Sequence, residues 1–193
     1  LRGTEIGWSR GQQVPSAEYD ALYLRFNPSN FNAAAWAKTA KAAGMKYLVF
    51  TTKHHDGFAL HDSKVSDYDA GSVLQRDLVK EIVDAARAEG LRIGFYHSVI
   101  DWHHDQYAYA KSKVLPHPLK GQPYPNGERD HAKYVTFLHA QVAELASNYG
   151  KIDILWWDYS GVDFQGDEAW RAFDLMRTVR TKLPGVIMNN RLF

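Results

Sequence analysis

The chain alternates between short apolar runs typical of strands and longer amphipathic segments typical of helices, and this order restricts it to an α/β fold. The apolar runs are continuous, as expected for strands of a parallel sheet covered by helices. A glycine or a Pro-Gly pair follows most of the helical segments, where helices commonly end. The pattern predicts strands at residues 47–51, 91–96, 152–157 and 186–188, and helices from residue 16 and at 32–43, 77–89, 130–149 and 167–183.

A doubly wound sheet and a (β/α)8 barrel both fit this order, and the residues that follow the strands favour the barrel. Polar or aromatic side chains come directly after each predicted strand, which is how barrel enzymes build their sites. No glycine-rich nucleotide-binding motif follows any of them. We therefore predict part of a TIM-like (β/α)8 barrel, about four β/α units. Residues 1–193 are expected to form one partial catalytic domain that is truncated at both ends.

Composition excludes several classes of protein. The 23 Lys and Arg residues against 22 Asp and Glu residues give a net charge of +1, which argues against a nucleic-acid binder. No apolar run is long enough to span a membrane. Cysteine is absent, so there is neither a disulfide nor a thiolate site. Residues 99–129 lack periodicity and are rich in proline and glycine, which predicts a functional loop over the site.

Asp158 is the strongest candidate for a catalytic group. It follows Trp156 and Trp157 at the end of a predicted strand. A carboxylate fixed in that position suits a nucleophile that attacks an anomeric carbon. Tryptophans beside it suit a sugar, whose C–H faces pack on aromatic rings. The alternative is an exposed aspartate that caps the next loop.

His54, His55 and Asp56 follow the first predicted strand. Neutral imidazoles exchange hydrogen bonds with hydroxyl groups, so the histidine pair fits a sugar site. Two alternatives stay open, a metal-dependent hydrolase that uses all three residues and a structural turn with one buried imidazole.

The remaining candidates lie near the other strand ends. Strand alternation sends only one of Tyr96 and His97 inward. Arg191 is expected to bind an oxygen or a nearby carboxylate, or else to form a salt bridge at its strand end. Residues 101–105 (DWHHD) invite a metal assignment, but a structural or solvated role is favoured because a flexible loop makes a poor cage. The sequence shows no partners for His61, His117, His131 and His139.

At these positions the sequence resembles glycoside hydrolase family 29, the α-L-fucosidases. Residues 31–58 (FNAAAWAKTAKAAGMKYLVFTTKHHDGF) are similar to a family block that ends in Lys-His-His-Asp-Gly-Phe, and residues 155–158 (LWWD) match a later block. The resemblance covers nearly the whole chain. Further matches follow in the family's order at residues 63–68, 76–77, 94–98, 101–102 and 189–191.

The resemblance implies a retaining exo-glycosidase that removes terminal α-L-fucose from oligosaccharides or glycoconjugates without a metal or a cofactor. Asp158 is implied to be the nucleophile that forms a covalent fucosyl-enzyme. His54 and His55 would bind the sugar hydroxyls, and Arg191 would lie close to the nucleophile. Pocket-lining roles are implied for Tyr96, for Trp156 near the C5 methyl group, and for Trp8, although Gly7 stands where the family often has glutamate.

Two parts of the family pattern have no match in the sequence. A His-Trp-Gly segment with another sugar-binding histidine would precede Leu1, and the glutamate that acts as general acid and base would follow Phe193. Glu128 and Glu168 follow no strand end and are poor substitutes. The family suggests a lysosomal, periplasmic or secreted protein, while linkage specificity and oligomeric state stay open. A non-catalytic carbohydrate-binding barrel is the alternative from a different class.

Overall fold

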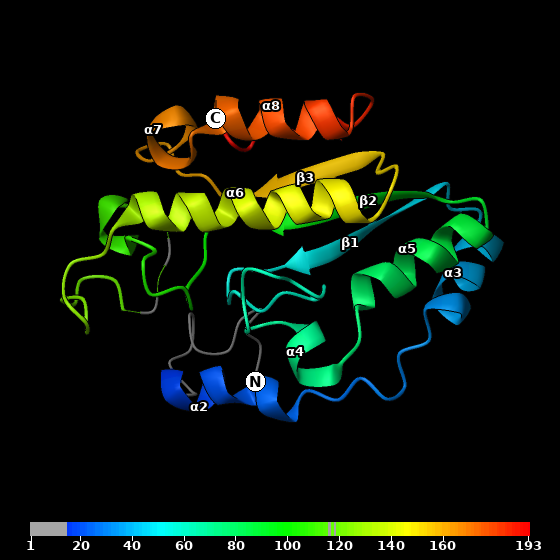
Figure 1. The fold of residues 1–193 in the computed structure, drawn as a ribbon, viewed down its shortest axis with the longest axis horizontal. Helices are drawn as coiled ribbons and strands as arrows, with labels where there is room; N and C mark the ends of the chain where they lie inside the picture. The colour runs from blue at the N-terminus through cyan, green and yellow to red at the C-terminus, as the bar shows by residue number, and fades with distance from the viewer. Residues whose placement is uncertain (1–14, 116, 118) are drawn as a thin grey trace.

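The predicted parallel sheet is confirmed by the computed structural model, which describes residues 15–115, 117 and 119–193 (Figure 1). Its four strands follow one another in chain order across the sheet. The expected contact of Trp8 lies outside the described residues. The strands are β1 (Tyr47–Lys53), β2 (Arg92–Ser98), β3 (Ile154–Asp158) and β4 (Ile187–Met188).

Helices connect the strands, and Figure 1 shows the long α6 running along the sheet. Three of the longer helices begin where an Asn or Asp side chain accepts a backbone N–H of the first turn, namely Asn32, Asp77 and Asp130. α3 packs against α5, and α6 packs against α8. The helical elements are α2 (Ser16–Asp20), η1 (Ala21–Arg25), α3 (Ala33–Ala42), α4 (Ala70–Leu74), α5 (Leu78–Ala88), η2 (Tyr109–Lys111), α6 (His131–Asn148), α7 (Gly166–Trp170) and α8 (Ala172–Lys182).

The single helix predicted at residues 167–183 is wrong, because it is two helices divided at Arg171. Arg171 has φ of 49°, in the left-handed region that ends a helix. Two histidines of α6 explain the break, since Nε2 of His131 lies 2.9 Å from the carbonyl oxygen of Ala169 and Nε2 of His139 lies 2.8 Å from that of Trp170. The carbonyls of Ala169 and Trp170 therefore accept hydrogen bonds from α6 and do not continue the backbone hydrogen bonding of their own helix.

The two faces of each strand have different surroundings, and this division positions the site. Phe95 and His97 of β2 and Leu155 and Trp157 of β3 are fully buried. The alternate residues point to the opposite face, where Trp156 is 45% exposed. As expected, only one of Tyr96 and His97 reaches the second face, and it is Tyr96.

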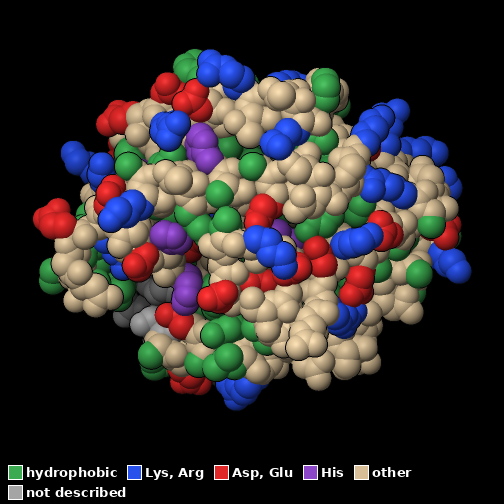
Figure 2. Space-filling model, in the orientation of Figure 1, with side chains coloured by type: hydrophobic (Ala, Val, Ile, Leu, Met, Phe, Trp, Pro, Cys, Tyr) green, Lys and Arg blue, Asp and Glu red, His purple; other side chains and the backbone are tan. Residues whose placement is uncertain are grey.

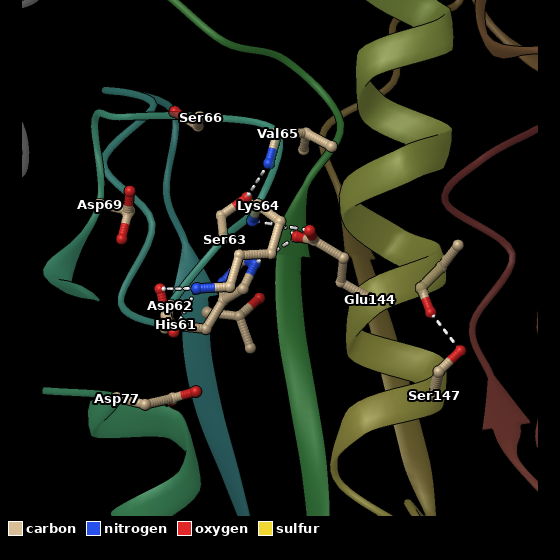
Figure 3. Close-up of polar contacts among 12 residues, drawn as sticks. His61, Asp62, Ser63, Lys64, Val65, Ser66, Asp69, Asp77, Glu144 and Ser147 are labelled. Atoms are coloured by element: carbon tan, nitrogen blue, oxygen red, sulfur yellow. Dashed lines mark hydrogen bonds and ion pairs between the residues drawn. The ribbon is translucent and has the colours of Figure 1, made fainter. Parts of the chain in front are cut away.

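The segment between β1 and α4 is tied to α6 by Glu144, whose side chain points toward it in Figure 3. Glu144 accepts hydrogen bonds from the hydroxyl of Ser63 at 2.9 Å and from the backbone N–H of Lys64 at 2.7 Å. Nε2 of the buried His61 lies 3.5 Å from the same carboxylate. This contact supplies a partner for His61 that the sequence did not reveal.

Within the stretch at residues 99–129, Ile100, Tyr107 and Leu115 bury their side chains in the core, whereas residues 121–129 are mostly exposed. Two buried histidines, His117 and His131, hold the buried part in place. His117 lies within hydrogen-bond distance of the carbonyl of Trp102 and accepts the N–H of Leu119. His131 bonds the carbonyl of Ala169 with one nitrogen and accepts the N–H of Ala108 with the other. Each ring therefore uses one nitrogen as donor and one as acceptor, which only the neutral imidazole allows. Burial accordingly lowers the pKa of His131 to about 4 and that of His117 to about 3.

We expect these histidines to make the folded state sensitive to acid. The unfolded chain protonates histidine near pH 6.5, whereas the folded chain does not protonate His131 until about pH 4. The contribution of each histidine to the free energy of unfolding is therefore fully present above about pH 6.5. It falls as the pH drops toward 4, by up to about 1.4 kcal/mol per pH unit for each histidine. Urea denaturation between pH 7 and pH 4.5 measures the slope. His131→Gln should flatten it, and an unchanged slope would contradict the assignment.

The surface shown in Figure 2 carries basic and acidic side chains intermixed over this face. No helix within the described ranges has both the length and the apolar character needed to cross a bilayer.

Candidate active site

The carboxylate of Asp158 lies at the end of β3, where side chains from three other segments surround it. The hydroxyl of Tyr96, on β2, donates a hydrogen bond of 2.6 Å to Oδ2. Nη1 of Arg191, just after β4, lies 2.8 Å from Oδ1. Nε2 of His55, which follows β1, lies 3.9 Å from Oδ2. The sequence-predicted residues of four strand ends thus meet around one carboxylate.

The two histidines lie side by side beside this carboxylate. Their ring centroids are 4.1 Å apart, and the ring of His54 stacks on Tyr96 at 5.5 Å. His54 is partly exposed, whereas His55 is 8% exposed and is held by Ser98, whose hydroxyl lies 2.7 Å from Nδ1. Polar nitrogens and an aromatic surface therefore line the space next to Asp158, an arrangement suited to hydroxyl groups.

Asn189 brings Arg191 to Asp158. Its side-chain oxygen accepts the backbone N–H of Trp157 at 3.0 Å, and its side-chain nitrogen donates to the carbonyl of the same residue at 3.0 Å. The amide thereby continues the pairing of β3 and β4 beyond the two residues of β4. The next turn carries the guanidinium to the carboxylate, where its positive charge offsets the negative charge.

Only one of the two tryptophans before Asp158 faces the site. Trp156 pairs in register with Tyr96 and lies on the same face of the sheet as Asp158. Trp157 points to the other face and is fully buried in the core. The expectation that both indoles flank the carboxylate is wrong for Trp157, because neighbouring residues of a strand point to opposite faces.

A buried ion pair that sequence reasoning missed supports the histidine turn. Nζ of Lys53 lies 3.0 Å from Oδ2 of Asp101, and both side chains are nearly inaccessible to solvent. Oδ1 of Asp101 accepts the backbone N–H groups of His103 and His104. Although burial alone would raise it, the Lys53 ammonium and the N–H of His104 hold the pKa of Asp101 below its usual value. Asp101 therefore has a structural role, as favoured for residues 101–105.

Gly57 leaves room for this ion pair, which leads to a prediction. A Cβ at position 57 would lie 2.4 Å from Oδ1 of Asp101, and the residue has φ of +86°. Gly57→Ala should therefore lower the free energy of unfolding by about 3 kcal/mol, from both overpacking and backbone strain. Gly121→Ala is the matched control, since Gly121 has the same φ of +86° with no atom within 4 Å. It should cost about 1 kcal/mol in urea denaturation, and equal losses for the two variants would contradict the steric argument.

The metal alternative proposed for His54, His55 and Asp56 does not match the geometry. Oδ2 of Asp56 lies 3.2 Å from the hydroxyl of Tyr19, and burial raises the pKa of Asp56. Among the described residues, the group whose ligand atoms lie within 4.8 Å of one another is His54, His55 and Asp158. Both oxygens of Asp158 already contact other groups, and the guanidinium of Arg191 beside it would repel a cation.

Comparison with known proteins gives one family. The model of the family described as Alpha-L-fucosidase matches residues 7–193. The tissue alpha-L-fucosidase of Bos taurus is 34% identical over 184 residues, which are 92% of this chain and 36% of that protein. The solved alpha-L-fucosidase isoenzyme 1 of Paenibacillus thiaminolyticus is 45% identical with a TM-score of 0.87, and the match covers 94% of this chain and 43% of that chain.

A second solved structure is the alpha-L-fucosidase AlfC of Lactobacillus casei with its alpha-L-fucose product. It is 32% identical with a TM-score of 0.85, and the match covers 100% of this chain and 62% of that chain. The chain thus spans less than two thirds of the length of each of these relatives. The likenesses confirm the prediction of a parallel sheet with alternating helices that forms part of a (β/α) barrel.

Proposed function

The chain belongs to the alpha-L-fucosidase family, and on that premise we propose that the full-length protein releases terminal α-L-fucose through a covalent intermediate on Asp158. The observation that carries the proposal is the placement of the Asp158 carboxylate. It is fixed at a strand end by the Tyr96 hydroxyl at 2.6 Å and the Arg191 guanidinium at 2.8 Å. Such a carboxylate is oriented before the substrate arrives, as a nucleophile needs to be.

The reaction has two steps. In the first, a carboxylate oxygen of Asp158 bonds to the anomeric carbon while the bond to the leaving-group oxygen breaks and a general acid protonates that oxygen. In the second, the residue that acted as acid takes a proton from a water molecule, whose oxygen bonds to the same carbon. The bond to Asp158 breaks, and the configuration of the sugar is retained. By resemblance to the family, we expect the general acid to be a glutamate in the loop after the strand that carries Arg191. Arg191 and Tyr96 would stabilise the carboxylate when it leaves.

The groups around Asp158 fit the recognition of a deoxy sugar. His54 and His55 offer ring nitrogens to the hydroxyl groups. Trp156, 45% exposed on the same face, offers an apolar surface to the C5 methyl group and the C–H bonds. The related Lactobacillus casei enzyme, solved with alpha-L-fucose as product, supports the same substrate class for this protein.

Trapping of the intermediate tests the proposal. A 2-fluoro-fucosyl fluoride transfers its fucosyl group to the nucleophile of a retaining fucosidase with loss of fluoride. The resulting ester hydrolyses slowly, so the labelled peptide can be identified by mass spectrometry. We expect one adduct, on Asp158, and loss of activity on an aryl α-L-fucoside at the same rate as labelling. An adduct on another residue, or turnover without an adduct, would contradict the role of Asp158.

The same assay separates the two alternatives. A metal-dependent hydrolase would lose activity after exhaustive chelation, whereas we expect activity to be unchanged. A non-catalytic carbohydrate-binding barrel would bind fucose without turnover of the aryl fucoside and without an adduct.

A further inference from the structure

We propose that Ser98 is a positioning residue that fixes the tautomer of His55, so that Nε2 of this histidine accepts a hydrogen bond from a hydroxyl group of the sugar. The inference rests on the proposed function for the identity of the sugar. The position of the proton on the ring rests on hydrogen-bond geometry alone.

The hydroxyl of Ser98 contacts two groups. Its oxygen lies 2.8 Å from the carbonyl oxygen of Ile100 and 2.7 Å from Nδ1 of His55. A carbonyl only accepts, so the one proton of the hydroxyl goes to Ile100. The oxygen of Ser98 must then accept a proton from Nδ1. The neutral ring of His55 therefore carries its hydrogen on Nδ1 and a lone pair on Nε2.

The direction of Nε2 gives this assignment a function. Nε2 lies 3.9 Å from Oδ2 of Asp158, on the side of the ring that faces the nucleophile. A lone pair there accepts a proton from a sugar hydroxyl bound next to the carboxylate. With the opposite tautomer, Nε2–H would face Asp158 at a distance longer than a hydrogen bond, and the ring would offer the sugar a donor in place of an acceptor. Ser98 thus selects which role His55 has.

The surroundings of Ser98 leave little freedom for another arrangement. Ser98 is fully buried and pairs in register with Asp158, so the residue that orients the histidine and the residue that attacks the sugar lie side by side on neighbouring strands. The backbone carbonyl of His55 also accepts the N–H of Trp102 at 2.7 Å, which fixes the turn that carries the ring.

The test has a spectroscopic and a kinetic part. In full-length protein with isotope-labelled histidine, NMR of the ring nitrogens and carbons reports the tautomer, and the signal of His55 is assigned by its loss in His55→Gln. We expect the Nδ1–H form in the wild type at pH 8, a shift toward the Nε2–H form in Ser98→Ala, and recovery of the Nδ1–H form in Ser98→Thr. Ser98→Ala should lower kcat/KM on an aryl α-L-fucoside about tenfold.

A double variant distinguishes positioning from general damage. If Ser98 acts through His55, then Ser98→Ala causes no further loss in the His55→Gln background. Ser63→Ala is the matched control. Ser63 is also buried, and its hydroxyl donates to one oxygen, of Glu144, while accepting one N–H, of Val65 (Figure 3). It should leave the His55 signal and kcat/KM unchanged.

Two results would overturn the inference. One is retention of the Nδ1–H form in Ser98→Ala. The other is a double variant whose loss of kcat/KM equals the product of the losses from Ser98→Ala and His55→Gln alone. Absence of fucoside turnover in the wild type would instead reject the proposed function. The NMR measurement would still decide the tautomer in that case.

Discussion

Replacing Asp158 with alanine is expected to reduce kcat on an aryl α-L-fucoside at least about a thousandfold, which corresponds to about 4 kcal/mol of activation free energy. The variant lacks the oxygen that bonds to the anomeric carbon, so the covalent step is lost. The fold should survive, because the Arg191 side chain left without its partner is 47% exposed and remains in contact with water. Steady-state kinetics on purified protein with a wild-type circular dichroism spectrum measures the effect.

Chemical rescue makes this experiment specific to a nucleophile. Azide is small enough to enter the space of the missing carboxylate and should restore part of the activity of Asp158→Ala, giving a fucosyl azide with inverted configuration at the anomeric carbon. Asp174→Ala is the control, since Asp174, on α8, forms exposed ion pairs with Arg171 before that helix and with Arg177 within it. It should retain full activity. A loss of less than about tenfold for Asp158→Ala would contradict its role as nucleophile.

Replacing Lys53 with methionine is expected to lower the free energy of unfolding by about 3–5 kcal/mol, because it leaves the buried carboxylate of Asp101 without its counter-charge. The ammonium of Lys53 also lies 5.4 Å from the ring centroid of Phe137 and 5.9 Å from that of Tyr134. Methionine fills most of the volume of lysine, so the loss reports the charge more than a cavity. Urea denaturation of the full-length protein measures it.

Lys64→Met is the matched control for this substitution. Lys64 pairs with Asp62 at 2.7 Å, but its side chain is 73% exposed and that of Asp62 is 44% exposed. Exposed ion pairs contribute about 0–1 kcal/mol, so this variant should lie near the wild type. In Lys53→Met, replacing Asp101 with asparagine should recover part of the loss, because the amide oxygen still accepts the two backbone N–H groups. Equal losses for Lys53→Met and Lys64→Met would contradict the importance of the buried pair.

The strands and long helices were predictable from the sequence because each has a hydrophobic pattern of its own. The predicted strand at residues 47–51 extends to Lys53, and the helix at 130–149 begins and ends within one residue of α6. The meeting of Asp158, His54, His55, Tyr96 and Arg191 also followed, since parallel strands end at the same edge of a sheet.

What the sequence did not reveal depends on contacts between distant residues. The break at Arg171 comes from two histidines on another helix, and no local propensity encodes it. Lys53 reads as an ordinary charged residue after a strand and Asp101 as a member of the cluster at residues 101–105, and nothing in the sequence pairs the two. The register of β1 against β2 also shifts between Thr51 and Lys53, so strand alternation does not reveal that Lys53 is buried. A charge in such a position needs a partner of opposite sign.

The contacts that hold the site have a consequence for the way the chain folds. Lys53 and Asp101 are 48 residues apart, His55 and Ser98 are 43 apart, and Tyr96 and Asp158 are 62 apart. Each contact closes a long loop, whose entropy must be lost before the contact contributes. The histidine turn can thus reach its final geometry only after β2 has docked on β1, and the nucleophile only after β3 has joined them. During synthesis, the site therefore forms late, after the ribosome has released the strand that carries Asp158.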